Sequence, residues 1–214
     1  MTSTIRALVT TSILISTQTY ANTCLSNCSC DRNSEVINCQ DGKFEIVPQN
    51  VPITARNLNL NNNKISELTD FGDLSNLISL SVENNNLNKI HFDVFDNMDN
   101  LQILKLKNNA LKSLDDDVFE WNPLKLEVID LSNNKFKFVQ HFLFYDLEKL
   151  QDIDLSGNEI SFIHPHAFQQ LKELLGLWLG LFCSKILTGN IIFTQNISSD
   201  GLASSDGLNK SSRK

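Results

Sequence analysis

The residues best able to form covalent or metal bonds are the cysteines, and four of the five lie within sixteen residues: Cys24, Cys28, Cys30 and Cys39. Thiols at this density form either two disulfides or a four-thiolate zinc site. The CxxxCxC spacing differs from the paired CxxC knuckles that usually hold zinc. The spacing therefore favours two disulfides, and Cys183 remains as an odd thiol.

The first 21 residues have the features of a secretory signal peptide. They contain no acid, a single base at Arg6 and an apolar stretch over residues 7–15, and Thr19 and Ala21 suit cleavage after Ala21. An ordinary N-terminal helix is the alternative, but the apolar run is short and precedes the cysteine cluster. We therefore expect a secreted, extracellular protein, whose oxidising surroundings also favour disulfides over zinc.

Catalytic motifs are missing from the sequence. It contains no GxSxG nucleophile turn, no GxxxxGK[ST] phosphate loop, no GxGxxG fingerprint and no HExxH zinc motif. Two clusters could in principle hold a metal, HPH at residues 164–166 and DDD at residues 115–117. The first is more typical of a turn, and the second lacks the alternating oxygen ligands of a calcium loop. The sequence predicts neither an enzyme nor a metal or cofactor site.

Charge and hydropathy argue against two classes of partner. The chain carries 25 acidic and 18 basic residues, a net charge of −7, which disfavours nucleic acid and anionic membranes and favours a basic partner. The apolar run at residues 174–183 is ten residues long. Because a bilayer span needs about 20 apolar residues, we expect no transmembrane span.

An internal repeat positions the remaining side chains. Five segments fit the pattern LxxLxLxxNxL, and their first residues are spaced by 22, 24, 25 and 24 residues: Ala55, Leu77, Leu101, Leu126 and Leu150. Slots four and six alternate as in a short strand, so they point to one side. One strand cannot bury that side alone, and stacked copies supply the missing partner. A fixed period of this kind predicts a solenoid.

Slot nine of each copy is an asparagine. It lies where the chain turns away from the strand, and its amide can pair with a backbone carbonyl and a backbone N–H of adjacent turns. We expect a structural asparagine ladder of five residues: Asn63, Asn85, Asn109, Asn134 and Asn158.

The second half of each unit places a phenylalanine five residues after an apolar residue. The phenylalanines of the last four copies are Phe95, Phe119, Phe144 and Phe168. We expect these rings to stack along the outer side of the solenoid. Neighbouring repeats then lie farther apart in this outer layer than in the sheet, where strands are about 4.8 Å apart. The two layers then differ in spacing, and the solenoid bends.

The combined pattern LxxLxLxxNxLxxLxxxxFxxL resembles the leucine-rich repeat of extracellular animal proteins such as Slit, Toll ectodomains and small matrix proteoglycans. The resemblance implies an α/β repeat fold, a right-handed horseshoe solenoid with a parallel β-sheet on its concave face. The segment CLSNCSCDRNSEVINCQDGKFEIVPQNVP resembles the cysteine-rich N-terminal flank of that family. That likeness implies a disulfide-bonded cap with the pairs Cys24–Cys30 and Cys28–Cys39.

These features divide the chain into five parts: signal peptide 1–21, cysteine-rich cap 22–52, five leucine-rich repeats 53–173, a degenerate sixth repeat or irregular end 174–193, and a disordered tail 194–214. The tail holds two glycosylation sequons, at Asn196 and Asn209. Because the sixth copy loses the pattern after Leu179, its uncapped strand edge and the thiol of Cys183 could form a dimer.

The side chains between the core leucines should line the concavity. Slots three, five and seven place a basic stripe beside an acidic one, and the predicted ligand-binding residues are Asn59, Glu83, Lys105, Lys107, Asp130, Asp152, Asp154 and Trp178. A patterned surface of this kind suits the selection of a protein ligand or receptor. The sequence therefore predicts an extracellular binding module of adhesion, guidance or immune signalling, and the alternative is a self-associating component of the extracellular matrix.

Overall fold

The computed structural model describes residues 24–31, 33, 35–115, 117–119, 125–145 and 147–180. Several predictions fall outside these residues: the signal peptide at 1–21, Cys183, most of the degenerate sixth repeat, and the tail with Asn196 and Asn209.

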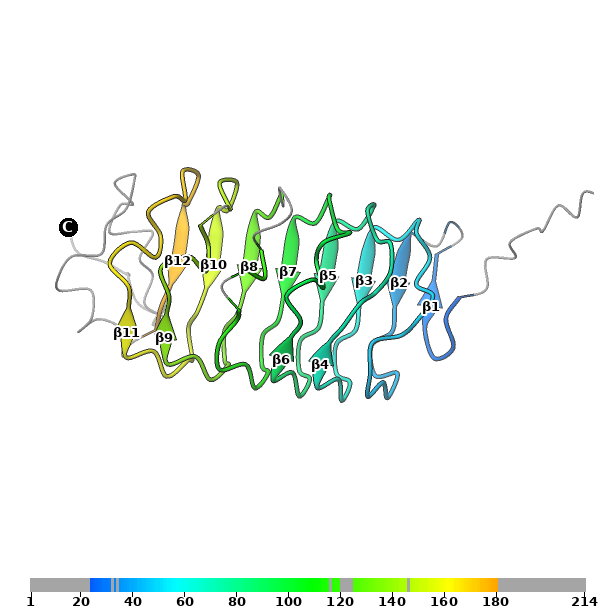
Figure 1. Cartoon of the computed structure of the whole chain (residues 1–214). Coiled ribbons are helices and arrows are strands. Elements are labelled where there is room, and N and C mark those ends of the chain that lie inside the picture. Colours follow the sequence, from blue (N-terminus) through cyan, green and yellow to red (C-terminus); the bar gives the residue numbers. More distant parts are fainter. Residues whose placement is uncertain are drawn as a thin grey trace, which may run out of the picture.

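One long sheet runs along the length of the described part of the molecule (Figure 1). Its eight strands follow the order of the chain: β1 (Ser29–Cys30), β2 (Val36–Asn38), β3 (Asn57–Asn59), β5 (Ser79–Ser81), β7 (Ile103–Lys105), β8 (Val128–Asp130), β10 (Asp152–Asp154) and β12 (Gly176–Trp178). The first pair is antiparallel and every later pair is parallel. The expected parallel-sheet solenoid is confirmed.

The register joins equal slots of successive repeats. Leu58 pairs with Leu80, and the same row continues through Leu104, Ile129, Ile153 and Leu177. Each of these side chains is at most 1% exposed. The slot-six side chains, five leucines and Val82, form a second buried row beside them. The core is therefore a column shared between repeats, since no single strand covers its own apolar side.

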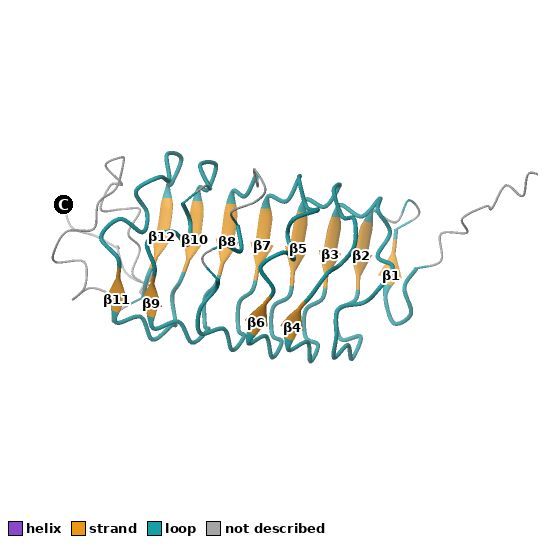
Figure 2. Cartoon of the chain, in the orientation of Figure 1, coloured by secondary structure: helices purple, strands orange, loops and turns teal. Residues whose placement is uncertain are grey.

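Short segments return the chain between the strands of the long sheet. They contain the pair β4 (Glu67–Leu68) and β6 (Lys89–Ile90) and the pair β9 (Phe138–Val139) and β11 (Phe162–Ile163) (Figure 2). The described residues form strands and turns and no helix, so none of them belongs to a helix long and apolar enough to cross a membrane.

The outer phenylalanines stack in two pairs. The ring centroids of Phe95 and Phe119 are 5.7 Å apart, and those of Phe144 and Phe168 are 5.9 Å apart. Both stacked pairs are 24 residues apart in sequence, whereas Phe119 and Phe144 are separated by 25. One extra residue in the repeat thus coincides with the break between the pairs.

The slot-nine asparagines join neighbouring turns through their side chains. The Asn109 Nδ2 group donates to the carbonyls of Val82 at 2.9 Å and Leu106 at 3.0 Å. Its Oδ1 atom accepts the backbone N–H of Leu87 at 2.9 Å. Asn63, Asn85, Asn134 and Asn158 make the same three kinds of bond. Each asparagine therefore pairs backbone groups of its own repeat and of the preceding one.

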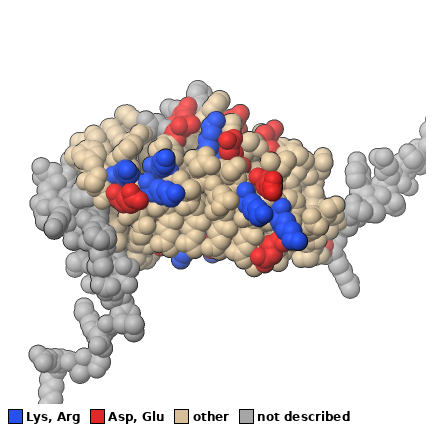
Figure 3. Space-filling view, turned by 90° about the horizontal axis from the view of Figure 1, so that it is seen from below, with Lys and Arg blue, Asp and Glu red and all other residues tan. Residues whose placement is uncertain are grey.

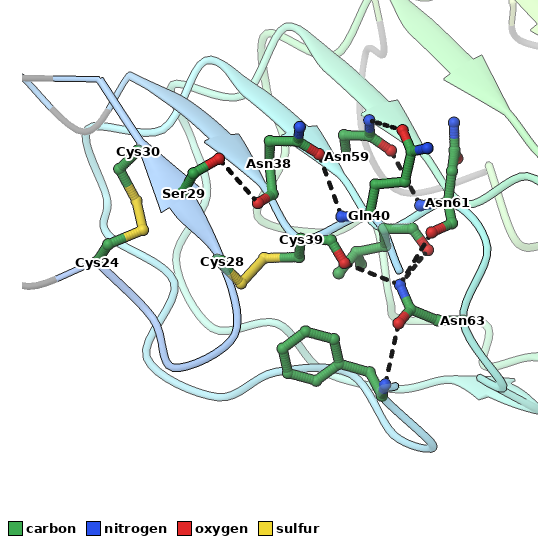
Figure 4. Close-up of a disulfide and its surroundings, with 12 residues drawn as sticks. Cys24, Cys28, Ser29, Cys30, Asn38, Cys39, Gln40, Asn59, Asn61 and Asn63 are labelled. Carbon is green, nitrogen blue, oxygen red and sulfur yellow. Dashed lines mark hydrogen bonds between the residues drawn. A yellow bond between two sulfur atoms is a disulfide. The ribbon is translucent and has the colours of Figure 1, made fainter. Parts of the chain in front are cut away.

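The N-terminal cap closes the first edge of the column (Figure 4). Cys24 is bonded to Cys30, and Cys28 to Cys39, which confirms the pairing that the resemblance implied. Cys39 is fully buried, and its carbonyl accepts a hydrogen bond from Asn63 at 3.0 Å. The cap thus gives the first repeat the bonds that a preceding repeat gives the others.

Replacing one ladder asparagine should destabilise the whole column. In an Asn109→Ala variant the Leu87 N–H loses its partner, and the Val82 carbonyl keeps only the bond from the Asn85 amide at 3.3 Å. Because an unpaired buried group costs about 1–3 kcal/mol, we expect the free energy of unfolding, measured by denaturant titration, to fall by about 2 kcal/mol. Asn97→Ala is the matched control, because Asn97 is exposed and its side chain has no hydrogen bond within the described chain. Equal losses in the two variants would contradict the ladder's role.

Candidate functional site

Strand alternation and register together build one continuous polar surface on the long sheet. The residues at slot five stand side by side from β2 to β12, in the order Asn38, Asn59, Ser81, Lys105, Asp130, Asp154 and Trp178. Slots three and seven flank this row. All eight residues predicted to bind a ligand lie on this face, which we call the concave face, and none of them is fully buried.

Amide and hydroxyl groups dominate the N-terminal part of the concave face. They line a shallow hollow of about 360 Å³ over β2, β3, β5 and β7, which includes Asn38, Asn57, Asn59, Ser79 and Glu83. The Oδ1 atom of Asn61 accepts hydrogen bonds from the Ser81 hydroxyl at 2.8 Å and the Glu83 N–H at 2.7 Å. These bonds fix the side chains across strands, so this part is ordered before any partner arrives.

Two lysines occupy the centre of the concave face. Lys105 lies between Ser81 and Asp130 in register, and Lys107 follows it at slot seven. In the described part of the chain neither ammonium group forms an ion pair. Both charges are therefore available to carboxylates of another molecule.

Three carboxylates follow the lysines. Asp130 accepts the Ser132 N–H at 2.9 Å, and Asp154 accepts the Ser156 N–H at 2.8 Å. Each of these bonds engages Oδ1, and Asp130 Oδ1 also accepts the Ser132 hydroxyl at 2.6 Å. Asp152 lies near Asp154 at slot three, and its carboxylate forms no hydrogen bond or ion pair within the described chain.

An aromatic ring closes the C-terminal end of the concave face. A Cβ atom built on Gly176 would overlap both the six-membered ring of Trp178 and the Oδ1 atom of Asp152. The indole of Trp178 therefore lies against the backbone of Gly176, next to the Asp152 carboxylate. An aromatic face beside carboxylates suits an ammonium or guanidinium group, which gains from both.

Three histidines meet on the return side of the repeats, away from the concave face. The ring centroid of His141 is 4.6 Å from that of His164 and 5.6 Å from that of His166. Desolvation and the two neighbouring imidazoles lower the pKa of His141. His164 Nδ1 accepts the His166 N–H at 3.2 Å, a turn bond within the HPH segment. Among the described residues, which exclude Asp116, no cluster of histidine, cysteine or acidic side chains could hold a metal ion.

Sequence reasoning missed two features of this structure. Asparagines at slot eight adopt positive φ, and the amide of Asn84 donates to Asn62 at 2.9 Å and that of Asn108 to Asn84 at 2.7 Å. The recurring Asn-Asn doublets were the available signal. The contact of His141 with the HPH segment was also missed, although the repeat period aligns residue 141 with residue 165.

The comparisons with known proteins agree with this architecture. The family model described as "Leucine rich repeat" matches residues 75–123 and 125–180. The crystal structure of human 5T4, titled Wnt-activated inhibitory factor 1 and trophoblast glycoprotein, is similar with a TM-score of 0.56 and 20% sequence identity, and the match covers 75% of this chain and 72% of that chain. At this identity the likeness shows the fold, and a fold alone does not define a ligand. No curated protein sequence matches the chain.

Placing a methyl group at residue 176 should displace the tryptophan. The chain has two tryptophans, so Trp121→Phe leaves Trp178 as the single reporter. In that background Gly176→Ala should shift the fluorescence emission to longer wavelength and increase acrylamide quenching, because the ring must leave the glycine backbone. Ser79→Ala, also at slot three, is the control and should leave the spectrum unchanged. An unaltered spectrum in Gly176→Ala would show that the ring does not lie there.

Proposed function

Since the chain is a leucine-rich-repeat protein with a disulfide-bonded N-terminal cap, we propose that it is an extracellular module that binds a protein on its concave face. The proposal rests on the order of polar and charged side chains along that face. Amides, two lysines, three aspartates and a tryptophan follow one another across adjacent strands.

The spacing of these groups describes the partner. Neighbouring strands lie about 4.8 Å apart, so the three steps from β7 to β12 extend over about 14 Å. A partner surface with a carboxylate opposite Lys105 or Lys107 and a lysine or arginine opposite Asp152 and Trp178 would match both ends. Complementary charges of this kind select the partner and speed its association. Leucine-rich-repeat domains commonly bind proteins, and the separation of charges on this face supports the same role.

The extracellular location rests on the cap and on the N-terminal sequence. Two disulfides within a short cap persist in oxidising compartments and are rare in the cytosol. Residues 1–21 are typical of a secretory signal peptide, and Asn196 and Asn209 lie in glycosylation sequons. We infer a secreted protein or part of a receptor ectodomain that acts in adhesion, guidance or immune signalling.

The arrangement of side chains on the concave face favours binding over catalysis. Its charged side chains are spread along a row, whereas a catalytic site needs a nucleophile and a base within hydrogen-bond reach of each other. Asp130 and Asp154 accept hydrogen bonds from backbone N–H groups, and Asp130 also accepts the Ser132 hydroxyl at 2.6 Å. Ser132 is only 1% exposed, so this hydroxyl is out of reach of a substrate. We therefore propose a binding module and expect it to need neither a cofactor nor a metal.

Neutralising the acidic part of the concave face should weaken capture of the partner. We expect the wild-type chain, immobilised and exposed to extracellular fluid, to retain a discrete protein identified by mass spectrometry. Asp130→Asn with Asp154→Asn keeps the Oδ1 acceptors but removes two charges. Loss of two charge pairs should weaken the retained protein's binding at least about tenfold.

The matched control is Asp70→Asn with Asp73→Asn. These aspartates also accept N–H groups two residues later, but they lie in the loop between β4 and β5. The control should capture as well as the wild type. Equal capture by all three chains would refute a concave-face site. Retention of only further copies of the chain, through the C-terminal edge or Cys183, would instead favour the matrix alternative.

A further inference from the structure

A second surface of this acidic protein is basic. We define the lysine flank as slots 10, 12 and 13 of the five repeats, the exposed positions around the buried slot 11. It holds five lysines and two glutamates, a balance of +3 within a chain of net charge −7: Lys64, Lys89, Lys112, Lys135, Lys137, Glu67 and Glu159. All seven charged side chains are exposed.

The repeat places these side chains together. Slot 13 belongs to the outer strands, so Glu67 pairs with Lys89 across β4 and β6, and Phe138 pairs with Phe162 across β9 and β11. Lys112 and Lys137 occupy the same slot in adjacent repeats. Figure 3 views the molecule from below, the side nearest these outer strands in Figure 1, and lysine and arginine side chains lie in groups on it, with acidic side chains beside them.

The flank is hollowed where its lysines are densest. A depression of about 330 Å³ is lined by Lys112, Ser113, Lys135, Lys137, Phe138 and Glu159. The ring of Phe138 is 42% exposed and that of the adjacent Phe162 is 54% exposed. Lysine stems and an aromatic ring therefore form an apolar floor, and the ammonium groups surround it.

The lysines of the flank are not neutralised by the protein itself. Within the described residues none of the five takes part in an ion pair, whereas Lys149 pairs with Glu173 and Lys172 with Glu148, both at 2.5 Å. Glu67 lies 3.4 Å from His91. Glu159 alone among the acids lines the depression. The surplus of positive charge thus faces solvent and requires an external anion for compensation.

We propose that the lysine flank binds a sulfated polysaccharide chain. A linear polyanion matches cations that recur along the stack, since Lys64 and Lys137 lie three repeats apart on the same flank. The exposed faces of Phe138 and Phe162 receive the C–H faces of sugar rings, and the lysines on either side of Phe138 meet the sulfates. A recessed floor fits a chain with projecting groups better than a flat lipid surface. The inference rests on the proposed extracellular location but not on the concave-face site.

Binding to immobilised heparin tests the proposal. The double variant Lys112→Gln with Lys137→Gln should bind heparin about 25-fold more weakly, because lysines near an anionic surface each contribute about fivefold. Its affinity should also depend less steeply on salt. The concave-face variant Lys105→Gln with Lys107→Gln loses the same charge and should bind heparin like the wild type. Equal heparin binding by the two variants would overturn the proposal.

Further probes separate the sulfated chain from other anions. Desulfated heparin, polyglutamate and vesicles with phosphatidylserine should each bind more weakly than heparin. Tighter binding of the wild type to polyglutamate or to vesicles would contradict the assignment. Phe138→Ala, which leaves all charges in place, should weaken heparin binding, and an unchanged affinity would remove the role of the aromatic floor.

The two proposed sites can fail separately. Thermal unfolding of the exposed-site variants should match that of the wild type, which excludes misfolding as the cause of lost binding. The lysine-flank variant should still capture the concave-face partner, and the Asp130→Asn with Asp154→Asn variant should still bind heparin.

Discussion

The structure depends on the fact that a single repeat cannot satisfy itself. Its leucines at slots four and six face an open side, and the turn after its strand leaves backbone groups without partners. The neighbouring repeat covers the leucines, and the asparagine at slot nine pairs the backbone groups of both turns. Stability is therefore a property of the stack, and its first edge requires the disulfide-bonded cap.

The binding surfaces follow from the same stacking. Because equal slots align in register, the residue type at each slot becomes a row on the surface, and the sequence of one row determines its chemistry. The slot-five row changes from amides to cations to carboxylates to an aromatic ring. Slots 10, 12 and 13 generate a separate basic flank. One repeat pattern thus carries two chemically distinct surfaces on different sides of its core column.

The sequence predicted the features that the period controls. The strands, the core rows and the parallel sheet follow from slots four and six, and the cap pairing followed from the resemblance of its cysteine spacing. Features that depend on side-chain conformation were out of reach. The indole of Trp178 lies on Gly176 because that residue has no Cβ, and His141 joins the HPH segment through the stacking of two loops. The return segments proved to be turns and two-residue strands, which a repeat pattern alone does not define.

Native-state hydrogen exchange tests the account's central claim most directly. The amides of Ile65, Leu87, Leu111 and Phe136 donate to ladder asparagines of the following repeat. If these bonds hold the stack together, the four amides should exchange only on global unfolding and be among the slowest in the protein. Exchange at these amides as fast as in the exposed turns would show that the repeats are not joined by the asparagine ladder.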